Sequence, residues 1–296
     1  MPGIMPQPFQ TIALVGKYNS PDIAEALNRL AAFILSQGRQ VLVEQKTADN
    51  IGALSFPVAP LAEIGRKADL VVVLGGDGTM LNVACELADF DVYLIGINQG
   101  RLGFLTDLFV EDMLPRMADL LRGEFQSEQR FLLQATVLRG GQPLCENMAF
   151  NDVVITKGVT ARLIEFEVSI DGQFVYSQRS DGLIVSTPTG STAYAMSAGG
   201  PILHPSLAAF VLVPICPHTL SNRPIAVNSL STVEIEISHA VDAVIHFDGQ
   251  RHVPLQIHDR VIIYRSRKRI SLLHPSDHSY FDTLRQKLRW GEKLES

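Results

Sequence analysis

The stretch from Asp69 to Leu81, DLVVVLGGDGTML, constrains the fold of this chain more than any other. Its five consecutive apolar residues at positions 70–74, three of them valine, predict a strand that is buried on both faces. Three glycines follow within four positions, and a helix is expected at residues 79–87. The pattern therefore predicts a buried strand that ends in a bare turn at the start of a helix.

Asp77 is the only acid in this turn, beside Gly75, Gly76, Gly78 and Thr79. Glycines let backbone N–H groups approach a ligand closely, and a helix N-terminus favours an anion. The turn is thus typical of phosphate chemistry with a base beside it. A structural turn with an incidental aspartate is an equal alternative on these residues alone, because Gly and Asp are common turn residues.

Strands alternate with helices around this stretch. Strands are expected at residues 11–15, 40–44, 70–74 and 92–97. The first helix should have Ser20 as its N-cap and Pro21 as its first residue, and should stop at Gly38. A second glycine-rich loop, residues 96–106, follows the last of these strands, at the edge where open α/β sheets bind ligands. Unbroken apolar strands between helices predict a parallel sheet covered on both faces.

After Arg130 the pattern changes to short β-like segments separated by Gly, Pro, Asn and Asp. They predict a second, all-β domain, with two-residue turns at Asp171-Gly172 and Gly140-Gly141. The tail, residues 277–294, is weakly helical and is expected to pack back on the first domain. The expected domains are 1–125, 126–275 and a returning tail, 276–296. The expected strands are residues 131–138, 149–156, 163–170, 174–177, 183–186, 233–237, 244–247 and 261–264.

Two polar clusters interrupt the β pattern. Asn151-Asp152 lies inside an apolar run, either as a bulge or as a hydrogen-bonding pair for sugar hydroxyls or a base edge. The block TPTGSTAY at residues 187–194 packs five hydroxyl-bearing residues around Gly190 at an expected helix start. One hydroxyl is enough for a helix cap, so the surplus favours binding of a diphosphate or an adenosine.

Composition and absent motifs exclude several classes of protein. The 296 residues are 46% hydrophobic, with a net charge of -6, which argues against a nucleic-acid or anionic-membrane surface. No run approaches the ~18 apolar residues of a membrane span, and the three cysteines form no C-x-x-C pair, so a reducing cytoplasm is the expected location. P-loop, dinucleotide-fold and protein-kinase motifs are missing. No metal site is expected among the eight histidines.

In this order, the motifs resemble those of bacterial NAD kinases over nearly the whole chain. Gly-Gly-Asp-Gly alone is shared with lipid kinases and phosphofructokinases, whereas the Thr-Gly-Ser-Thr-Ala-Tyr block is far more specific. The motifs that carry the resemblance are Gly75-Gly76-Asp77-Gly78-Thr79, Gly96-Ile97-Asn98 with Gly103-Phe104-Leu105, Asn151-Asp152, Arg179-Ser180-Asp181-Gly182, the 187–194 block with Ser197-Ala198-Gly199-Gly200-Pro201, and Asp248-Gly249-Gln250.

The resemblance implies an α/β domain, a β-sandwich domain, NAD bound between them, and transfer of the ATP γ-phosphoryl group to the 2′-hydroxyl of the adenosine ribose. Asp77 would be the general base, and Arg162 would lie near the 2′-phosphate of the product. Mg²⁺ would arrive with ATP, and the protein would be a homo-oligomer, a tetramer. The other residues implied for the nucleotide sites are Gly75, Gly76, Gly78, Thr79, Asn151, Asp152, Arg179, Asp181, Thr189, Gly190, Ser191, Thr192, Ala193, Tyr194 and Gln250.

Two other functions share part of these motifs. A lipid or sugar kinase would share the Gly-Gly-Asp-Gly turn without needing the 187–194 block. A non-catalytic sensor of NAD or NADP would need the binding residues but no turnover.

Overall fold

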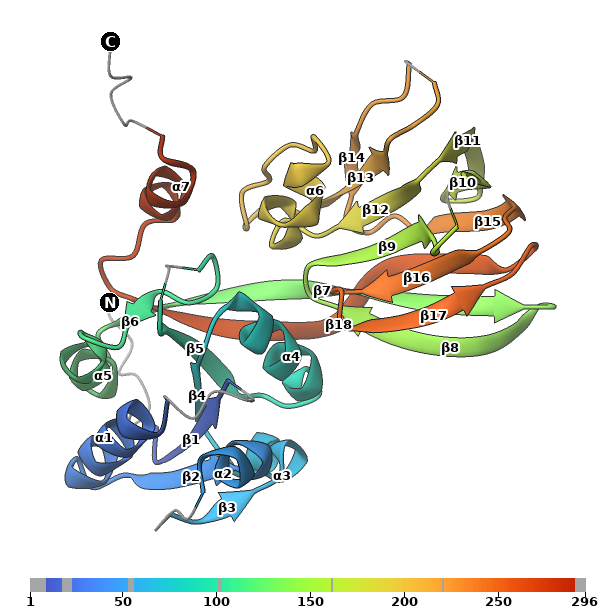
Figure 1. The fold of residues 1–296 in the computed structure, drawn as a ribbon. Helices are drawn as coiled ribbons and strands as arrows, with labels where there is room; N and C mark the ends of the chain where they lie inside the picture. The colour runs from blue at the N-terminus through green and yellow to red at the C-terminus, as the bar shows by residue number, and fades with distance from the viewer. Residues whose placement is uncertain are drawn as a thin grey trace. The chain divides into compact units, whose positions relative to one another are not determined.

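The computed structural model describes residues 9–17, 23–52, 56–100, 103–160, 162–219 and 221–290 (Figure 1). The chain divides into two compact units, the first formed by Met1–Gln129 with Ile270–Ser296 and the second by Arg130–Arg269. Two long strands, β7 (Phe125–Arg139) and β18 (Arg260–Pro275), contribute residues to both units. The first unit thus includes helix α7 and the described chain before it, residues 270–290.

The first unit contains a parallel sheet with strand order β18-β5-β4-β1-β2-β3, and β6 pairs with β5. The four strands predicted here are confirmed to within one residue at either end. The bounds are β1 (Thr11–Gly16), β2 (Gln40–Glu44), β3 (Val58–Ala59), β4 (Leu70–Leu74), β5 (Tyr93–Asn98) and β6 (Leu108–Phe109). The short strands β3 and β6 have no apolar run long enough to predict them.

Helices cover both faces of this sheet (Figure 1), which explains why every residue of β4 is buried. Helices α1 (Ile23–Ser36) and α5 (Met113–Leu121) share one hydrophobic core with alternate residues of the strands. The other helices of the unit are α2 (Gln45–Ile51), α3 (Leu61–Lys67), α4 (Asp77–Leu87) and α7 (Tyr280–Leu288). The predicted cap at Ser20 and Pro21 lies outside the described residues, whereas Gly38, with φ +72°, follows α1 as predicted.

The strand order reverses between β1 and β4. From β1 the chain continues to β2 and β3 on one side, and from β4 it continues to β5 on the other. Ligands of open α/β sheets bind at the carboxyl ends of the strands at such a switch point. The switch point is therefore lined by the residues at the carboxyl ends of β1 and β4, namely Gly16-Lys17 and Gly75-Gly76.

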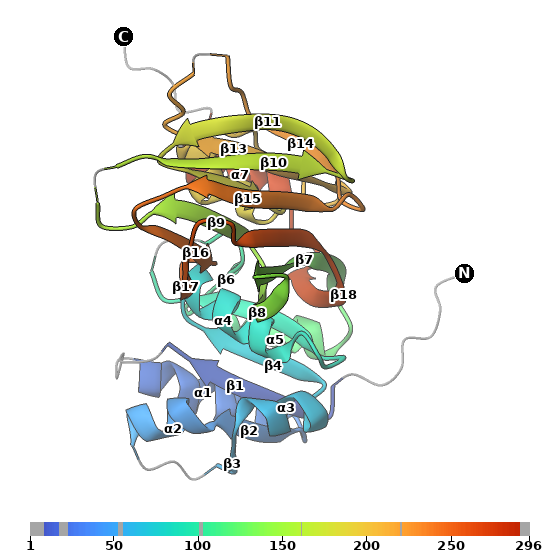
Figure 2. The ribbon, with the colours of Figure 1, turned by 90° about the vertical axis from the view of Figure 1, so that its right-hand side faces the viewer.

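The second unit is a sandwich of two sheets (Figure 2). One sheet has the order β11-β10-β15-β18-β7-β8 and the other β14-β13-β12-β9-β16-β17, and the pairs with a defined register are antiparallel. The bounds are β8 (Gln142–Ala149), β9 (Asp152–Lys157), β10 (Ile164–Ile170), β11 (Gln173–Ser180), β12 (Gly182–Ser186), β13 (Ala209–Ile215), β14 (Ile225–Asn228), β15 (Val233–His239), β16 (Ala243–Phe247) and β17 (Arg251–Leu255).

Alternate residues of both sheets form one core between them. Phe166 of β10, Phe210 of β13 and Phe247 of β16 are among the largest of these side chains, and all are essentially inaccessible to water. The hairpin turns are confirmed: Asp171 and Gly172 have φ 51° and 76°, and Gly140 and Gly141 have φ 57° and 78°. Two successive residues of positive φ match the twist of antiparallel strands.

The strands of the second unit differ from the prediction in three ways. The predicted strand at residues 149–156 breaks at Phe150 and Asn151, so β8 lies in one sheet and β9 in the other. Strand β11 is longer than the expected 174–177, since it runs from Gln173 to Ser180, and only Asp181 separates it from β12. Strands β13, β14 and β17 were not predicted.

The helix expected after the hydroxyl-rich block is a 3₁₀ turn, η1 (Gly190–Thr192), followed by the short helix α6 (Tyr194–Ser197). Ala193 separates them, with a conformation that is neither helical nor extended (φ -102°, ψ -126°).

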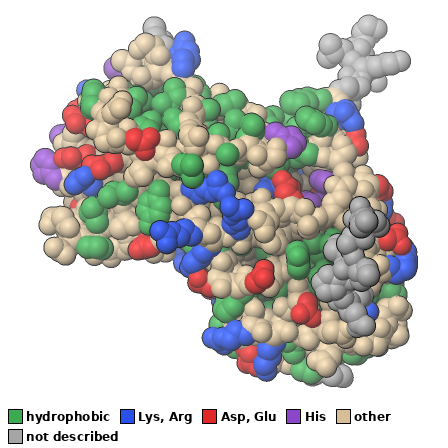
Figure 3. Space-filling view, turned by 180° about the vertical axis from the view of Figure 1, so that it is seen from behind, with side chains coloured by type: hydrophobic (Ala, Val, Ile, Leu, Met, Phe, Trp, Pro, Cys, Tyr) green, Lys and Arg blue, Asp and Glu red, His purple; other side chains and the backbone are tan. Residues whose placement is uncertain are grey.

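Acidic and basic side chains are interspersed over the described part of the face drawn in Figure 3. Among the described residues, no helix is both long and apolar enough to cross a bilayer.

Candidate active site

The glycine turn lies at the carboxyl end of β4, at the switch point of the first unit. Gly76 is extended, with φ -106° and ψ -175°, and α4 begins at Asp77, two residues earlier than predicted. Gly75 packs so closely on Thr79 that a Cβ would lie 2.7 Å from the Thr79 hydroxyl oxygen. The turn thus places Asp77 in the first turn of a helix, where backbone N–H groups remain without intrahelical partners.

The Asp77 carboxylate organises the second glycine-rich loop. It accepts hydrogen bonds from the backbone N–H groups of Phe104 at 2.8 Å and Leu105 at 3.0 Å, and the Thr106 hydroxyl is 3.4 Å away. A Cβ at Gly103 would lie 2.0 Å from Asp77 Oδ1, so only glycine fits there. Two ionised oxygens offer about four acceptor positions, so these bonds orient the carboxylate and leave further lone pairs for a ligand.

A separate pocket of about 350 Å³ lies in the second unit. It brings together four of the predicted residues, Asn151, Asp152, Ala193 and Tyr194. The remaining described residues that line it are Val154, Thr156, His246, Asp248 and Gly249. The predicted polar pair and the end of the hydroxyl-rich block therefore meet at one cavity.

The Asp248 side chain holds the backbone that lines this pocket. Asp248 is part of a motif found in the sequence, but no role was predicted for it. Its carboxylate accepts three backbone hydrogen bonds, from Phe150 at 2.8 Å, Asn151 at 2.7 Å and Asp152 at 3.0 Å. These bonds take the place of inter-strand backbone hydrogen bonds at the point where the chain passes from the sheet that contains β8 to the sheet that contains β9. Asn151 Oδ1 is buried and has no hydrogen-bond partner among the described residues. Buried polar atoms usually have such a partner, so this oxygen is a candidate acceptor for a donor group of a ligand.

The pKa values of three groups in the pocket are shifted from their usual values. Burial, and then the neighbouring Asp248, raise the pKa of Asp152 to about 7. Burial, and then the nearby His252, lower the pKa of His246, so this imidazole is neutral at pH 7 and offers one donor and one acceptor. Burial also raises the pKa of Tyr194. At neutral pH the pocket therefore holds groups that can both donate and accept hydrogen bonds without a full charge.

We expect Asp152→Asn to stabilise the protein more at pH 8 than at pH 5. Between pH ~4, the usual aspartate value, and the raised pKa of about 7, folded Asp152 keeps a proton that the unfolded chain has lost. The wild-type free energy of unfolding therefore falls as pH rises through this window, by on the order of 1–3 kcal/mol between pH 5 and pH 8. Thermal denaturation of both proteins at several pH values measures the difference. A constant difference would mean that folded Asp152 is already ionised at pH 5.

Most of the hydroxyl-rich block is used to hold its own backbone. The Thr187 hydroxyl donates to the Phe150 carbonyl at 2.7 Å and accepts from Gly190 N–H at 3.1 Å. The hydroxyl of Ser191 donates to the Pro188 carbonyl at 2.6 Å, and that of Thr192 donates to the Thr189 carbonyl at 3.3 Å. This dense bonding explains the surplus of hydroxyls structurally and leaves Tyr194, 45% exposed, as the side chain that reaches the pocket.

Contacts with neighbouring residues explain one glycine and one threonine of the block. A Cβ at Gly190 would lie 2.2 Å from the Asn151 carbonyl oxygen, so the block packs directly on the polar pair. Arg130, buried and not predicted, donates to the Thr189 hydroxyl at 3.0 Å.

The other predicted residues of the second unit lie outside the described lining of the pocket. Asp181 pairs with Lys157 at 2.7 Å, and Arg179 lies 3.6 Å from Glu165. Gln250 is exposed on the hairpin between β16 and β17, and Arg162 is exposed before β10.

Sequence reasoning missed several residues at these sites. Lys17 follows β1 at the switch point, and a Cβ on Gly75 would lie 3.4 Å from its Cβ. Its signal was a lysine directly after a buried strand. His246 has no such signal, because only the fold brings it to the pocket. Asp107, His274 and His278 also come together, although no histidine cluster was predicted. The spacing of four between the two histidines was the available sign.

The comparisons with known proteins agree over most of the chain. The family model for the ATP-NAD kinase N-terminal domain matches residues 12–125, and the model for the C-terminal domain matches residues 150–274. The NAD kinase of Thiobacillus denitrificans is 54% identical over 287 residues, which cover 97% of this chain and 99% of that protein. The NAD kinase of Nitrosomonas eutropha is 52% identical, with 97% of each chain covered.

Solved structures show the same fold. The crystal structure of an NAD kinase from Archaeoglobus fulgidus in complex with ATP superposes with a TM-score of 0.75 at 25% identity, covering 94% of this chain and 98% of that one. Yeast NADH kinase complexed with NADH superposes with a TM-score of 0.86 at 24% identity, covering 97% of this chain and 89% of that one. This chain belongs to the NAD kinase family, whose members are phosphotransferases with an alcohol group as acceptor.

Proposed function

We propose that this chain transfers the γ-phosphoryl group of ATP to the 2′-hydroxyl of the adenosine ribose of NAD, with Asp77 as the general base. The observation that carries the assignment is the carboxylate of Asp77, in the glycine turn at the switch point, which is held by the backbone N–H groups of Phe104 and Leu105 from the second glycine-rich loop. A base oriented in this way accepts the proton of the attacking hydroxyl, which leaves the ribose oxygen to attack phosphorus.

The remaining roles follow from the chemistry of the two sites. Gly75, Gly76, Gly78 and Thr79 are proposed to lie beside the phosphates, because they form the turn and first residues of α4, and a helix N-terminus favours an anion. The pocket with Asn151, Asp152 and Tyr194 suits a nucleoside, because it combines an aromatic face with neutral donors and acceptors. Asp181, Arg179, Gln250 and the residues from Thr189 to Ala193 are proposed to complete the NAD site.

Mg²⁺ is expected to arrive with ATP. A phosphate-bound Mg²⁺ keeps several waters and needs only one or two carboxylates, and Asp77 is the carboxylate that the glycine turn offers. When bound, the ion would neutralise charge on the transferring phosphoryl group.

The decisive assay follows NADP formed from ATP and NAD by the untagged full-length protein. NADP that accumulates over many turnovers supports the proposal. Binding of NAD or NADP without turnover would instead identify a sensor. Phosphorylation of diacylglycerol or fructose 6-phosphate in place of NAD would identify a lipid or sugar kinase.

Arg162→Ala is expected to weaken NADP binding by roughly 10- to 100-fold while NAD binding changes far less. NADP carries a 2′-phosphate that NAD lacks, and a charged hydrogen bond to phosphate contributes about 1.5–3 kcal/mol. Arg162 is exposed and therefore available to a ligand. Calorimetric titration of both nucleotides measures the two losses. Arg267→Ala, at an exposed arginine of the same unit, is the control and should change neither affinity.

Equal losses for NAD and NADP in the Arg162 variant would mean that this residue does not recognise the 2′-phosphate.

The protein is also proposed to work in the cytoplasm as a homo-oligomer, a tetramer on the family resemblance. Sedimentation equilibrium of the purified chain tests the subunit number.

A further inference from the structure

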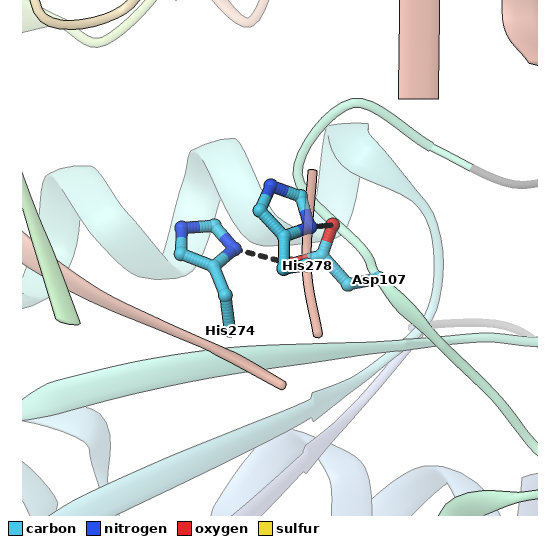
Figure 4. Close-up of side chains that lie close together, drawn as sticks. All are labelled: Asp107, His274 and His278. Carbon is cyan, nitrogen blue, oxygen red and sulfur yellow. Dashed lines mark hydrogen bonds and ion pairs between the residues drawn. The ribbon is translucent and has the colours of Figure 1, made fainter. Parts of the chain in front are cut away.

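Two histidines and an aspartate of the first unit come together in a cluster that does not include Asp77 (Figure 4). Asp107 lies just before β6, His274 lies near the end of β18, and His278 lies between β18 and α7. Each offers one ligand atom, and these atoms all lie within 4.8 Å of one another. Side chains from two distant stretches of sequence thus converge on one point.

Both imidazoles turn the same nitrogen toward the aspartate, as Figure 4 shows. His274 Nδ1 contacts one oxygen of Asp107, and His278 Nδ1 is 3.6 Å from the other. The two rings stack with centroids 4.3 Å apart and planes 20° from parallel. Two imidazole nitrogens and one carboxylate oxygen form a donor set that Zn²⁺ uses where three protein ligands leave a fourth position open.

The surroundings of His274 match those of a metal ligand. Its other ring nitrogen, Nε2, lies 3.3 Å from Glu128 Oε2. Histidine ligands almost always have a carboxylate, a carbonyl or water beside their second ring nitrogen. Glu128 occupies this place at ion-pair distance, without a hydrogen bond from Nε2. Asp277 is not available as a ligand, because Arg116 binds both of its oxygens at 3.0 and 2.9 Å.

Space for a further ligand lies beside the cluster. A pocket of about 300 Å³ is lined by Asp107 and His278 together with residues of β6, α5 and α7. The side chain of His274 is 6% exposed and that of Asp107 8%, so the donors are shielded while the pocket gives access from one side. An ion could enter by this route and keep a water molecule as its fourth ligand.

We propose that Asp107, His274 and His278 form a site for a divalent transition metal of the Zn²⁺ class, with Glu128 as the residue that positions His274. Mg²⁺ does not fit this donor set, because it prefers oxygen ligands and octahedral geometry. The site is distinct from the Mg²⁺ expected with ATP and takes no part in the proposed chemistry.

An ion here would connect two elements near Asp77. Asp107 immediately follows Leu105 and Thr106, which contact the Asp77 carboxylate, and Lys287 of α7 lies over the ring of Phe104, 5.6 Å from its centroid. The metal would therefore fasten the start of α7 to the loop that orients Asp77. This gives the site a structural effect that does not depend on turnover.

The test is titration of the untagged, chelator-treated full-length protein with Zn²⁺ in the presence of excess Mg²⁺. We expect one saturable site in the wild-type protein and an increase in its thermal unfolding temperature on adding Zn²⁺. His278→Gln should weaken Zn²⁺ binding by at least ~10-fold, since loss of an outer-shell partner alone costs 10- to 100-fold. His258→Gln is the matched control, because His258 is exposed and 3.6 Å from Glu236. It should bind Zn²⁺ as the wild type does.

Co²⁺ serves as a second probe that needs no variant to fold, because its visible spectrum reports the coordination geometry. A tetrahedral or five-coordinate spectrum with nitrogen and oxygen ligands supports the site. Three results would overturn the proposal: no saturable Zn²⁺ binding, equal competition by Mg²⁺, or unchanged binding in folded His278→Gln. Unchanged binding in folded His278→Gln would mean that Zn²⁺ binds elsewhere, for example at the exposed thiol of Cys216. Asp107→Asn provides an independent variant with the same expected loss.

Discussion

Asp77→Asn is expected to lower turnover by ~10²–10⁴, the usual contribution of a general base, while most of the affinity for NAD remains. The amide removes the proton acceptor but has nearly the same shape as the carboxylate. Steady-state rates of NADP formation measure the loss, and calorimetric titration with NAD measures the affinity. A turnover close to that of the wild type would contradict the role of Asp77.

The control separates loss of the base from disturbance of the loop that the carboxylate holds. Thr106→Val removes the hydroxyl that lies 3.4 Å from Asp77 Oδ1 and keeps the carboxylate and the volume of the side chain. We expect its turnover to stay within about 10-fold of the wild type, because general-base catalysis is retained. If both variants lose activity equally, the loop rather than the base accounts for the effect.

Phe166→Ala is expected to destabilise the protein by about 3–5 kcal/mol, the range for removing a fully buried aromatic ring. Phe166 is inaccessible to water in the core between the two sheets of the second unit. Truncation loses the transfer free energy of the ring and leaves a cavity. Urea denaturation followed by circular dichroism measures the change.

Phe174→Ala is the matched control from the adjacent strand of the same hairpin. Phe174 is 62% exposed, and substitutions at such positions usually change stability by less than about 0.5 kcal/mol. Equal losses in the two variants would show that the Phe166 ring is not the packed centre that the sandwich requires.

Much of the first unit could be predicted because its signals are local. The apolar run at residues 70–74 can be buried only between two covering layers, and Gly75 and Gly76 end it, so the strand, its burial and the position of Asp77 follow from neighbouring residues. The hairpin at Asp171-Gly172 is equally local, since two residues of positive φ suffice to reverse the chain.

The tertiary structure decided which polar residues meet. An apolar run cannot reveal that β8 and β9 lie in different sheets, because the break at Phe150 is held by the carboxylate of Asp248, about a hundred residues later in the chain. Burial, and then the charge of this distant Asp248, raise the pKa of Asp152. Asp107 and His274 are likewise far apart in sequence and converge only when β18 joins the first sheet beside β5. Sequence by itself determined the strands, turns and acid of the glycine loop, because these depend on adjacent residues. The folded chain decided the pocket and the histidine cluster, because both depend on contacts that close long loops.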